Sequence, residues 1–156
     1  MERLDIQHRL AQLGISLPAP APPAGAYVPF VITGNLLLVA GQLPMKDGAV
    51  VHHGRVGSEL TIEAGVAAAR LCGLNLLAQA QAACGGDLGR VQRVLRLAGF
   101  VQAAPGFGDH PKVLNGASEL MVEVFGQAGR HVRIAVGAAS LPLGAAVEVE
   151  GTFEIA

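Results

Sequence analysis

The chain has 156 residues, of which 51% are hydrophobic and 15% are charged, and its formal net charge is −1 at pH 7. This length fits a single domain spanning residues 1–156, and so small a net charge excludes the strongly basic surface typical of proteins that bind nucleic acid or anionic membranes. Because few charged residues are available to cover the surface, the composition favours an oligomer in which subunits hide part of it.

Residues 1–24 are predicted to form an N-terminal extension. Leu4, Leu10 and Leu13 recur near helical spacing, which predicts a short helix over residues 2–13. The Pro/Ala-rich run that follows favours an extended segment. The extension has no continuous apolar run, so it does not resemble a secretory signal.

Two apolar runs, residues 28–32 and 36–41, are predicted to form a β-hairpin around Thr33-Gly34-Asn35. The same turn residues and two prolines interrupt the longest apolar stretch, which argues against a membrane span. A short additional strand is expected within residues 48–57.

The first long helix is predicted to be capped by Ser58 and to stop at Gly85-Gly86. Glu59 and Glu63 would then lie favourably at its positive N-terminal end. Residues 91–103 follow as a strand, whose side chains should alternate strictly between two faces. Val91, Arg93, Leu95 and Leu97 would share one face, opposite Gln92, Val94 and Arg96.

A second helix is predicted from Asp109, as its cap, to Gly126, with Pro111 in the first turn. Strands over residues 131–138 and 146–155 complete the chain. The last strand divides into an acidic face and an apolar face, the acidic one carrying Glu148, Glu150, Thr152 and Glu154.

This order of elements predicts an α+β fold, in which two main helices cover one face of a β-sheet. Two helices cannot also cover the other face, so a second or third copy of the chain is expected there.

The cysteines and histidines show no grouping typical of a metal site, and none is predicted. Cys72 and Cys84 are expected to be buried free thiols, which fits a reducing, cytoplasmic location. The chain also lacks a GxSxG motif, so a serine-nucleophile hydrolase is poorly supported.

Arg133 lies within a strand-like apolar run, and Glu150 lies on the next predicted strand. One interpretation is a structural ion pair bridging adjacent strands. The other is a site in which Arg133 binds a ligand carboxylate and Glu150 orients or activates a water molecule. The pattern alone leaves both interpretations open.

Three segments together resemble the RidA/YjgF family of reactive intermediate deaminases, in a longer form with an N-terminal helix. They are GAYVPFVITGNLLLVAGQLP, HPKVLNGASELMVEVFG and VRIAVGAASLPLGAAVEVEG, and they run in the family's order from about residue 25 to 155. The most specific pattern is R-x-x-V-x-x-x-x-L-P followed by V-E-V-E. The resemblance implies a chorismate-mutase-like fold with a mixed sheet, assembled as a homotrimer with clefts between subunits.

The family hydrolyses 2-imino and enamine acids to 2-oxo acids and ammonia, and the resemblance implies that no metal or organic cofactor takes part. By matching position, Arg133 would bind the substrate carboxylate and Glu150 would orient the attacking water. The resemblance also assigns substrate binding to Tyr27, Asn115, the backbone of Gly41 and the carbonyl of Ala135.

The chain departs from the family at two of these places, since Ala40 stands where a serine is common and Ala135 where a cysteine is common. A trimer that binds a small carboxylate metabolite without turnover is therefore the main alternative. Endoribonuclease activity is a weaker one, because the chain has few aromatic residues and no basic patch, so nucleic acid is not an expected partner.

Overall fold

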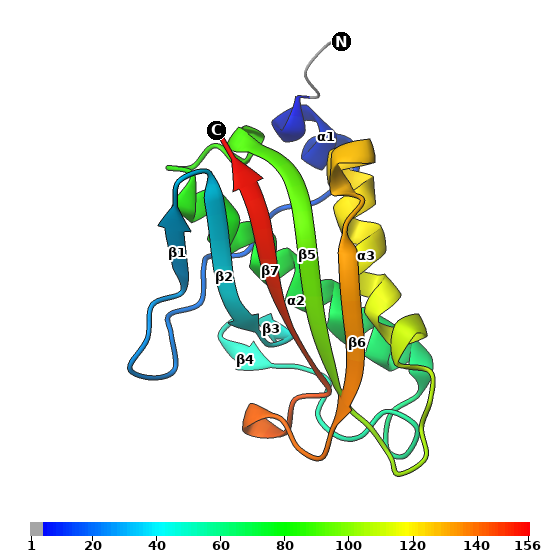
Figure 1. Ribbon diagram of the computed structural model, residues 1–156. Helices are drawn as coiled ribbons and strands as arrows, with labels where there is room; N and C mark the ends of the chain where they lie inside the picture. The colour runs from blue at the N-terminus through cyan, green and yellow to red at the C-terminus, as the bar shows by residue number, and fades with distance from the viewer. Residues whose placement is uncertain (1–4) are drawn as a thin grey trace.

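The computed structural model describes residues 5–156, shown as a ribbon in Figure 1. Its helices are α1 (Ile6–Gln12), α2 (Ile62–Ala83) and α3 (His110–Phe125), with 3-10 turns η1 (Leu88–Arg90), η2 (Gly126–Gly129) and η3 (Pro142–Gly144). Its strands are β1 (Phe30–Thr33), β2 (Leu36–Gln42), β3 (Met45–Lys46), β4 (Ala49–Val50), β5 (Val91–Gln102), β6 (Val132–Ala138) and β7 (Val147–Ile155).

The main sheet has five strands in the order β1-β2-β7-β5-β6, and β3 pairs with β4 in a separate small ribbon. Neighbouring strands of the main sheet are antiparallel except β5 and β6, which are parallel. Both long helices lie side by side on one face of this sheet (Figure 1). The predicted α+β fold, with a mixed sheet and two main helices on one face, is confirmed.

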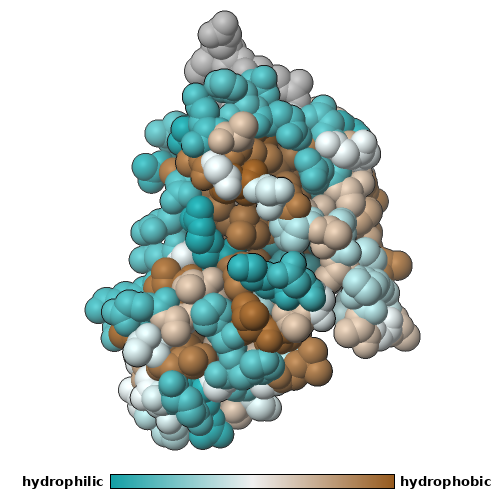
Figure 2. Space-filling view, turned by 180° about the vertical axis from the view of Figure 1, so that it is seen from behind, coloured by the Kyte–Doolittle hydropathy of each residue, from teal (hydrophilic) through white to brown (hydrophobic). Residues whose placement is uncertain are grey.

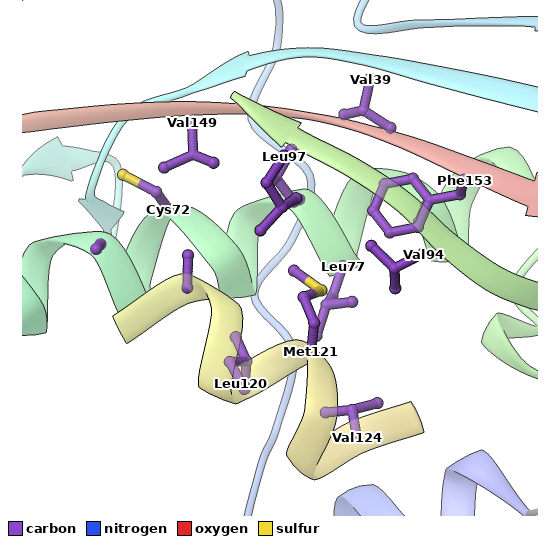
Figure 3. Packing of buried hydrophobic residues seen from close by; sticks show 14 of the residues in the cluster. Val39, Cys72, Leu77, Val94, Leu97, Leu120, Met121, Val124, Val149 and Phe153 are labelled. Carbon is purple, nitrogen blue, oxygen red and sulfur yellow. The ribbon is translucent and has the colours of Figure 1, made fainter. Parts of the chain in front are cut away.

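The hydrophobic core fills the space between the sheet and the two long helices. Figure 3 shows Val94, Leu97 and Phe153 on the sheet pointing toward Leu77 of α2 and Met121 of α3. All five side chains are fully buried. On β7, the odd-numbered residues face this core and the glutamates face away, as the alternating sequence predicts.

Helices α2 and α3 approach so closely that only glycine fits between them. A Cβ atom placed on Gly116 of α3 would fall on the carbonyl oxygen of Val66 in α2, and would lie 3.2 Å from the backbone nitrogen of Arg70. These neighbours are backbone atoms, which cannot rotate away. The absence of a side chain at Gly116 thus lets α3 lie in close contact with the backbone of α2.

The predicted caps are wrong in detail. Helix α2 starts one turn later than expected, because Thr61 and not Ser58 caps it, with the Thr61 hydroxyl accepting a hydrogen bond from the Ala64 amide at 3.1 Å. Glu59 instead accepts a bond from the Arg55 backbone amide at 2.9 Å. Asp109 precedes α3 as predicted, but its side chain makes no capping bond to any described residue and lies 3.6 Å from Lys112.

Strict alternation along β5 is also wrong. The register against β7 slips between Val91 and Arg93 and again between Val94 and Arg96, where β5 carries one extra residue each time. Val94 is consequently buried on the helix side, while Arg96 is exposed. The chain gives no sequence signal for such bulges, because a run of mixed apolar and basic residues fits either register.

The face of the sheet opposite the helices, called here the open face, is not covered by any described element. It exposes apolar side chains from three strands: Val31, Leu36, Leu38, Val132, Ile134 and Val136. The helix side, seen from behind in Figure 2, mixes hydrophilic residues with apolar patches. The open face is thus the part of the structure where a partner surface is expected.

The N-terminal extension packs against the helices. Ile6 and Leu10 of α1 are buried, and the Arg9 side chain donates to the Glu123 carbonyl of α3 at 2.8 Å. The Gln79 amide of α2 donates to the Ala21 carbonyl at 2.8 Å, which holds the Pro-rich segment against that helix. The predicted helix over residues 2–13 is confirmed over Ile6–Gln12, while Leu4 lies outside the described residues.

Candidate functional site

Arg133 is half-buried between β6 and α3, and its bonds all go to neutral acceptors. One terminal nitrogen, Nη1, donates to Asn115 Oδ1 at 2.9 Å and to Ser118 Oγ at 3.1 Å. The other, Nη2, donates to the Pro111 carbonyl at 3.3 Å. No carboxylate among residues 5–156 forms an ion pair with this guanidinium. Arg133 is therefore held in place with its charge unneutralised, as a receptor for an anion requires.

The fold explains why Arg133 and Asn115 meet. Arg133 pairs with Leu97 of β5, whose side chain faces the helices, so Arg133 points to the helix side as well. The next pair, Ala135 with Gly99, lies on the same side. A Cβ on Gly99 would collide with Leu114, so this glycine lets α3 lie close to the sheet and brings Asn115 within reach of Arg133.

Glu150 lies on the other face of the sheet. It pairs with Ala98 of β5, and its carboxylate is 3.6 Å from the Arg96 guanidinium in an exposed ion pair on the open face. Strand β5 also separates β6 from β7. The alternative of a structural Arg133–Glu150 pair across adjacent strands is therefore wrong, and within one chain these two side chains do not converge.

Tyr27 and Gly41 lie together near the opposite edge of the sheet from Arg133. They line a hollow of about 110 Å³ with Ala40, the Pro-rich segment Ala21–Ala24 and Leu143. The Tyr27 hydroxyl accepts a hydrogen bond from the Ala24 amide at 3.2 Å, so its position depends on the extension.

Glu148, to which the sequence assigned no role, lies in close contact with Gly41. A Cβ on Gly41 would be only 2.5 Å from Glu148 Oε1, so the glycine makes room for the carboxylate. Burial raises the pKa of Glu148, and the negative charge of Glu150 raises it further. The only sequence signal for this residue is its place beside Glu150 on the acidic face of the last strand.

A second, larger hollow of about 500 Å³ opens beside Arg133. Its other lining residues are Ser118, Glu119, Val122, Glu123, Arg130 and His131. Of these, Ser118 and His131 bond to each other at 2.9 Å and were not singled out by the sequence. Ser118 lies within the segment HPKVLNGASELMVEVFG, but the resemblance assigns no role to it or to His131. The parallel pairing of β6 with β5 brings His131 next to α3.

Both cysteines are buried free thiols, as predicted. Burial raises the pKa of Cys72 well above its usual value, and the nearby Glu148 charge acts in the same direction. Cys72 is thus a poor nucleophile. Within residues 5–156, no three His, Cys, Asp or Glu side chains gather as a metal site would need.

None of the helices described between residues 5 and 156 combines the length and the hydrophobicity that a membrane crossing requires.

The chain is similar to known proteins over most of its length. The family model described as "YjgF/chorismate mutase-like, putative endoribonuclease" matches residues 7–153. Protein TCP17 of Trypanosoma cruzi is 50% identical over 147 residues, covering 94% of this chain and 91% of the relative.

Two solved structures are also similar. Atu1372 from Agrobacterium tumefaciens, a protein of unknown function, is 47% identical with a TM-score of 0.89, and the match covers 97% of this chain and 94% of that one. A "putative endoribonuclease" from Shewanella oneidensis MR-1 is 37% identical with a TM-score of 0.93, covering 97% and 100%.

Proposed function

Since the chain belongs to the YjgF/chorismate mutase-like family, we propose that it hydrolyses 2-imino and enamine acids to 2-oxo acids and ammonia. The observation that carries this proposal is Arg133, a half-buried guanidinium held by three neutral acceptors. Its planar fork matches a carboxylate, the group that every such substrate shares. The proposed compartment is the cytoplasm, where the two free thiols would stay reduced.

We further propose that the working unit is a homotrimer whose subunits meet through the open face. The six exposed apolar side chains of that face support this, because a subunit with so much apolar surface is stabilised by covering it. The candidate site residues also fall into two groups that lie in different parts of one subunit. Arg133 and Asn115 lie at the β6 edge, whereas Gly41, Tyr27 and Glu150 lie toward β2 or on the open face.

In the proposed site, one copy supplies Arg133 and a neighbouring copy supplies Glu150. Arg133 fixes the substrate carboxylate and so removes orientational freedom from the reaction. Glu150 accepts a proton from water while the water oxygen bonds to the imine carbon and the C=N electron pair moves to nitrogen. Glu150 then returns the proton to nitrogen. Ammonia leaves as the C–O bond becomes a carbonyl, and it takes up the hydroxyl proton.

An imine-trapping assay tests the activity. An amino-acid oxidase generates imino acids in the presence of semicarbazide, and the protein should lower the yield of semicarbazone by hydrolysing the imine first. Arg133→Ala should abolish this effect, while Arg130→Ala, which changes an exposed arginine of the same hollow, should keep it. Equal activity in wild-type protein and Arg133→Ala would refute the proposal.

Mixing two inactive variants tests the division of the site between copies. Arg133→Ala and Glu150→Gln subunits, unfolded and refolded together, should regain part of the activity, because some clefts then receive an intact Arg133 and an intact Glu150. If both residues of a site came from the same copy, the mixture would stay inactive.

The alternative function is binding of a small carboxylate metabolite without turnover. Ala40 lines the Tyr27 hollow and Ala135 packs at the core beside Arg133, so neither position offers a polar side chain to a substrate. A thermal-shift screen with 2-oxo acids, run beside the imine assay, separates the two functions. Stabilisation without turnover favours the sensor. Degradation of RNA by the purified protein would instead favour the endoribonuclease activity in the family description.

A further inference from the structure

A chain of hydrogen bonds links Arg133 to the ring of His131. Ser118 Oγ lies 3.1 Å from Arg133 Nη1 and 2.9 Å from His131 Nε2. The other ring nitrogen, Nδ1, lies 2.6 Å from the Gly129 carbonyl oxygen. The chain thus runs from Gly129 of η2 through His131, which precedes β6, and Ser118 of α3 to Arg133 of β6.

The chemistry of these groups fixes the direction of every bond. A carbonyl oxygen can only accept, so His131 Nδ1 carries the hydrogen and donates it to Gly129. In a neutral imidazole, Nε2 is then an acceptor, and the Ser118 hydroxyl must donate to it. This leaves the lone pairs of the Ser118 oxygen for Arg133, which can only donate. While His131 is neutral, every donor in the network has an acceptor, including the Ser118 hydroxyl hydrogen, which His131 Nε2 accepts.

We propose that His131 is a positioning residue for Arg133, acting through Ser118, and that protonation of its ring weakens carboxylate binding at Arg133. This inference rests on the proposed function, since it assigns regulation of the same site. It adds two residues to which the resemblance assigns no role, and it makes the affinity of the site depend on pH.

Protonation would place a donor where the Ser118 hydroxyl needs an acceptor. The Ser118 oxygen would receive hydrogens from both His131 and Arg133, and its own hydrogen would lose its partner. Two positive charges would also lie on either side of one hydroxyl group. We expect Arg133 to leave the position in which Asn115 and Ser118 hold it.

The charged groups around His131 come from three elements. Arg133 lies on β6, Arg130 at the end of η2, and Glu119 and Glu123 on α3, where Glu123 is paired with Arg70 at 3.1 Å. Burial lowers the pKa of His131 and the Arg133 charge lowers it further, although the bond to Gly129 opposes both. The lowered pKa favours the neutral ring, so the change is expected on acidification.

The test measures the affinity of 2-oxobutanoate, a stable product analogue, by calorimetry between pH 5 and pH 8. In wild-type protein, the Kd should rise roughly tenfold as His131 becomes protonated, the loss expected for one hydrogen bond to a charged group. His131→Gln should make the Kd independent of pH over this range. His8→Gln, which changes an exposed histidine of α1, should keep the wild-type profile.

Ser118→Ala provides a second variant should His131→Gln fail to fold. It should raise the Kd at pH 7 roughly tenfold and abolish the pH dependence, whereas Ser118→Thr, which keeps the hydroxyl, should restore both. Binding that strengthens on acidification, or an unchanged profile in both His131→Gln and Ser118→Ala, would overturn the inference. The proposed function fails separately, if Arg133→Ala binds 2-oxobutanoate and hydrolyses imines as well as wild-type protein.

Discussion

Replacing Gly116 with alanine should destabilise the protein, although the same change normally stabilises a helix. The added methyl group would collide with the Val66 carbonyl of α2. Because the obstacle is backbone, α3 must move away from α2 as a unit. Gly116 also lies between Asn115 and Ser118, the two side chains that hold Arg133, so this movement should disturb the site as well.

The size of the effect follows from two opposing contributions. Overpacking against rigid backbone costs about 3 kcal/mol, at the upper end of the usual range for an added methyl group. Alanine in place of glycine in a helix interior recovers about 1 kcal/mol. The net loss of about 2 kcal/mol should lower the Tm by about 4–8 °C in a chain of this size.

Calorimetry at a fixed protein concentration measures this Tm, and calorimetric titration with 2-oxobutanoate measures the accompanying loss of affinity. Ala67→Gly, at an exposed position of α2, isolates the helix-propensity contribution and should cost only about 1 kcal/mol. If Gly116→Ala melts at or above the wild-type Tm, the reasoning about close contact between α2 and α3 is refuted.

Four further predictions concern the site and the surface. Gly41→Ala should displace the Glu148 carboxylate and lower imine turnover roughly tenfold or more in the semicarbazide assay, and unchanged kinetics would contradict the proposed cleft. Glu150→Gln should lower the pKa of Glu148 in a carboxyl-carbon NMR titration, since it removes the neighbouring negative charge. Because the folded pKa of Glu148 is raised, its contribution to stability is present below the unfolded value and is lost as pH rises through the folded pKa. Glu148→Gln should accordingly reduce the fall in the free energy of unfolding with rising pH, as measured by urea unfolding at several pH values. Ile134→Asp should break the proposed trimer, so that light scattering gives a mass near the 15.9 kDa of one chain, whereas a mass unchanged from wild type would place the interface elsewhere.

Much of the fold could be predicted because its signals are local. The long helices have apolar residues at helical spacing, with glycines at or shortly after their ends, and β7 alternates buried residues with polar ones. The cap of α2 could not be predicted, because Ser58 and Thr61 are both good caps and only packing selects the later start. The bulges of β5 follow from pairing with β7, which is distant in sequence.

The site was predictable only in part for a related reason. The resemblance singled out Arg133 and Asn115, and the structure brings them together. The alternation along β7 predicts that Glu150 faces away from the core, but sequence could not reveal that Arg133 points to the helix side, because this follows from its pairing with Leu97 of β5. The resemblance assigns no role to Ser118 or His131. They meet because β6 pairs with β5 and because α3 lies close to the sheet at Gly99.

The position of β6 at the end of the sheet has a consequence for newly made chains. Its outer edge is not paired with any strand of residues 5–156. On the open face, β6 also exposes Val132, Ile134 and Val136. Such an edge is a template for pairing with a wrong chain, and an inward-pointing charge is one way in which natural proteins discourage it. Arg133 is that charge, so an Arg133→Leu protein should aggregate during refolding in addition to losing its carboxylate receptor.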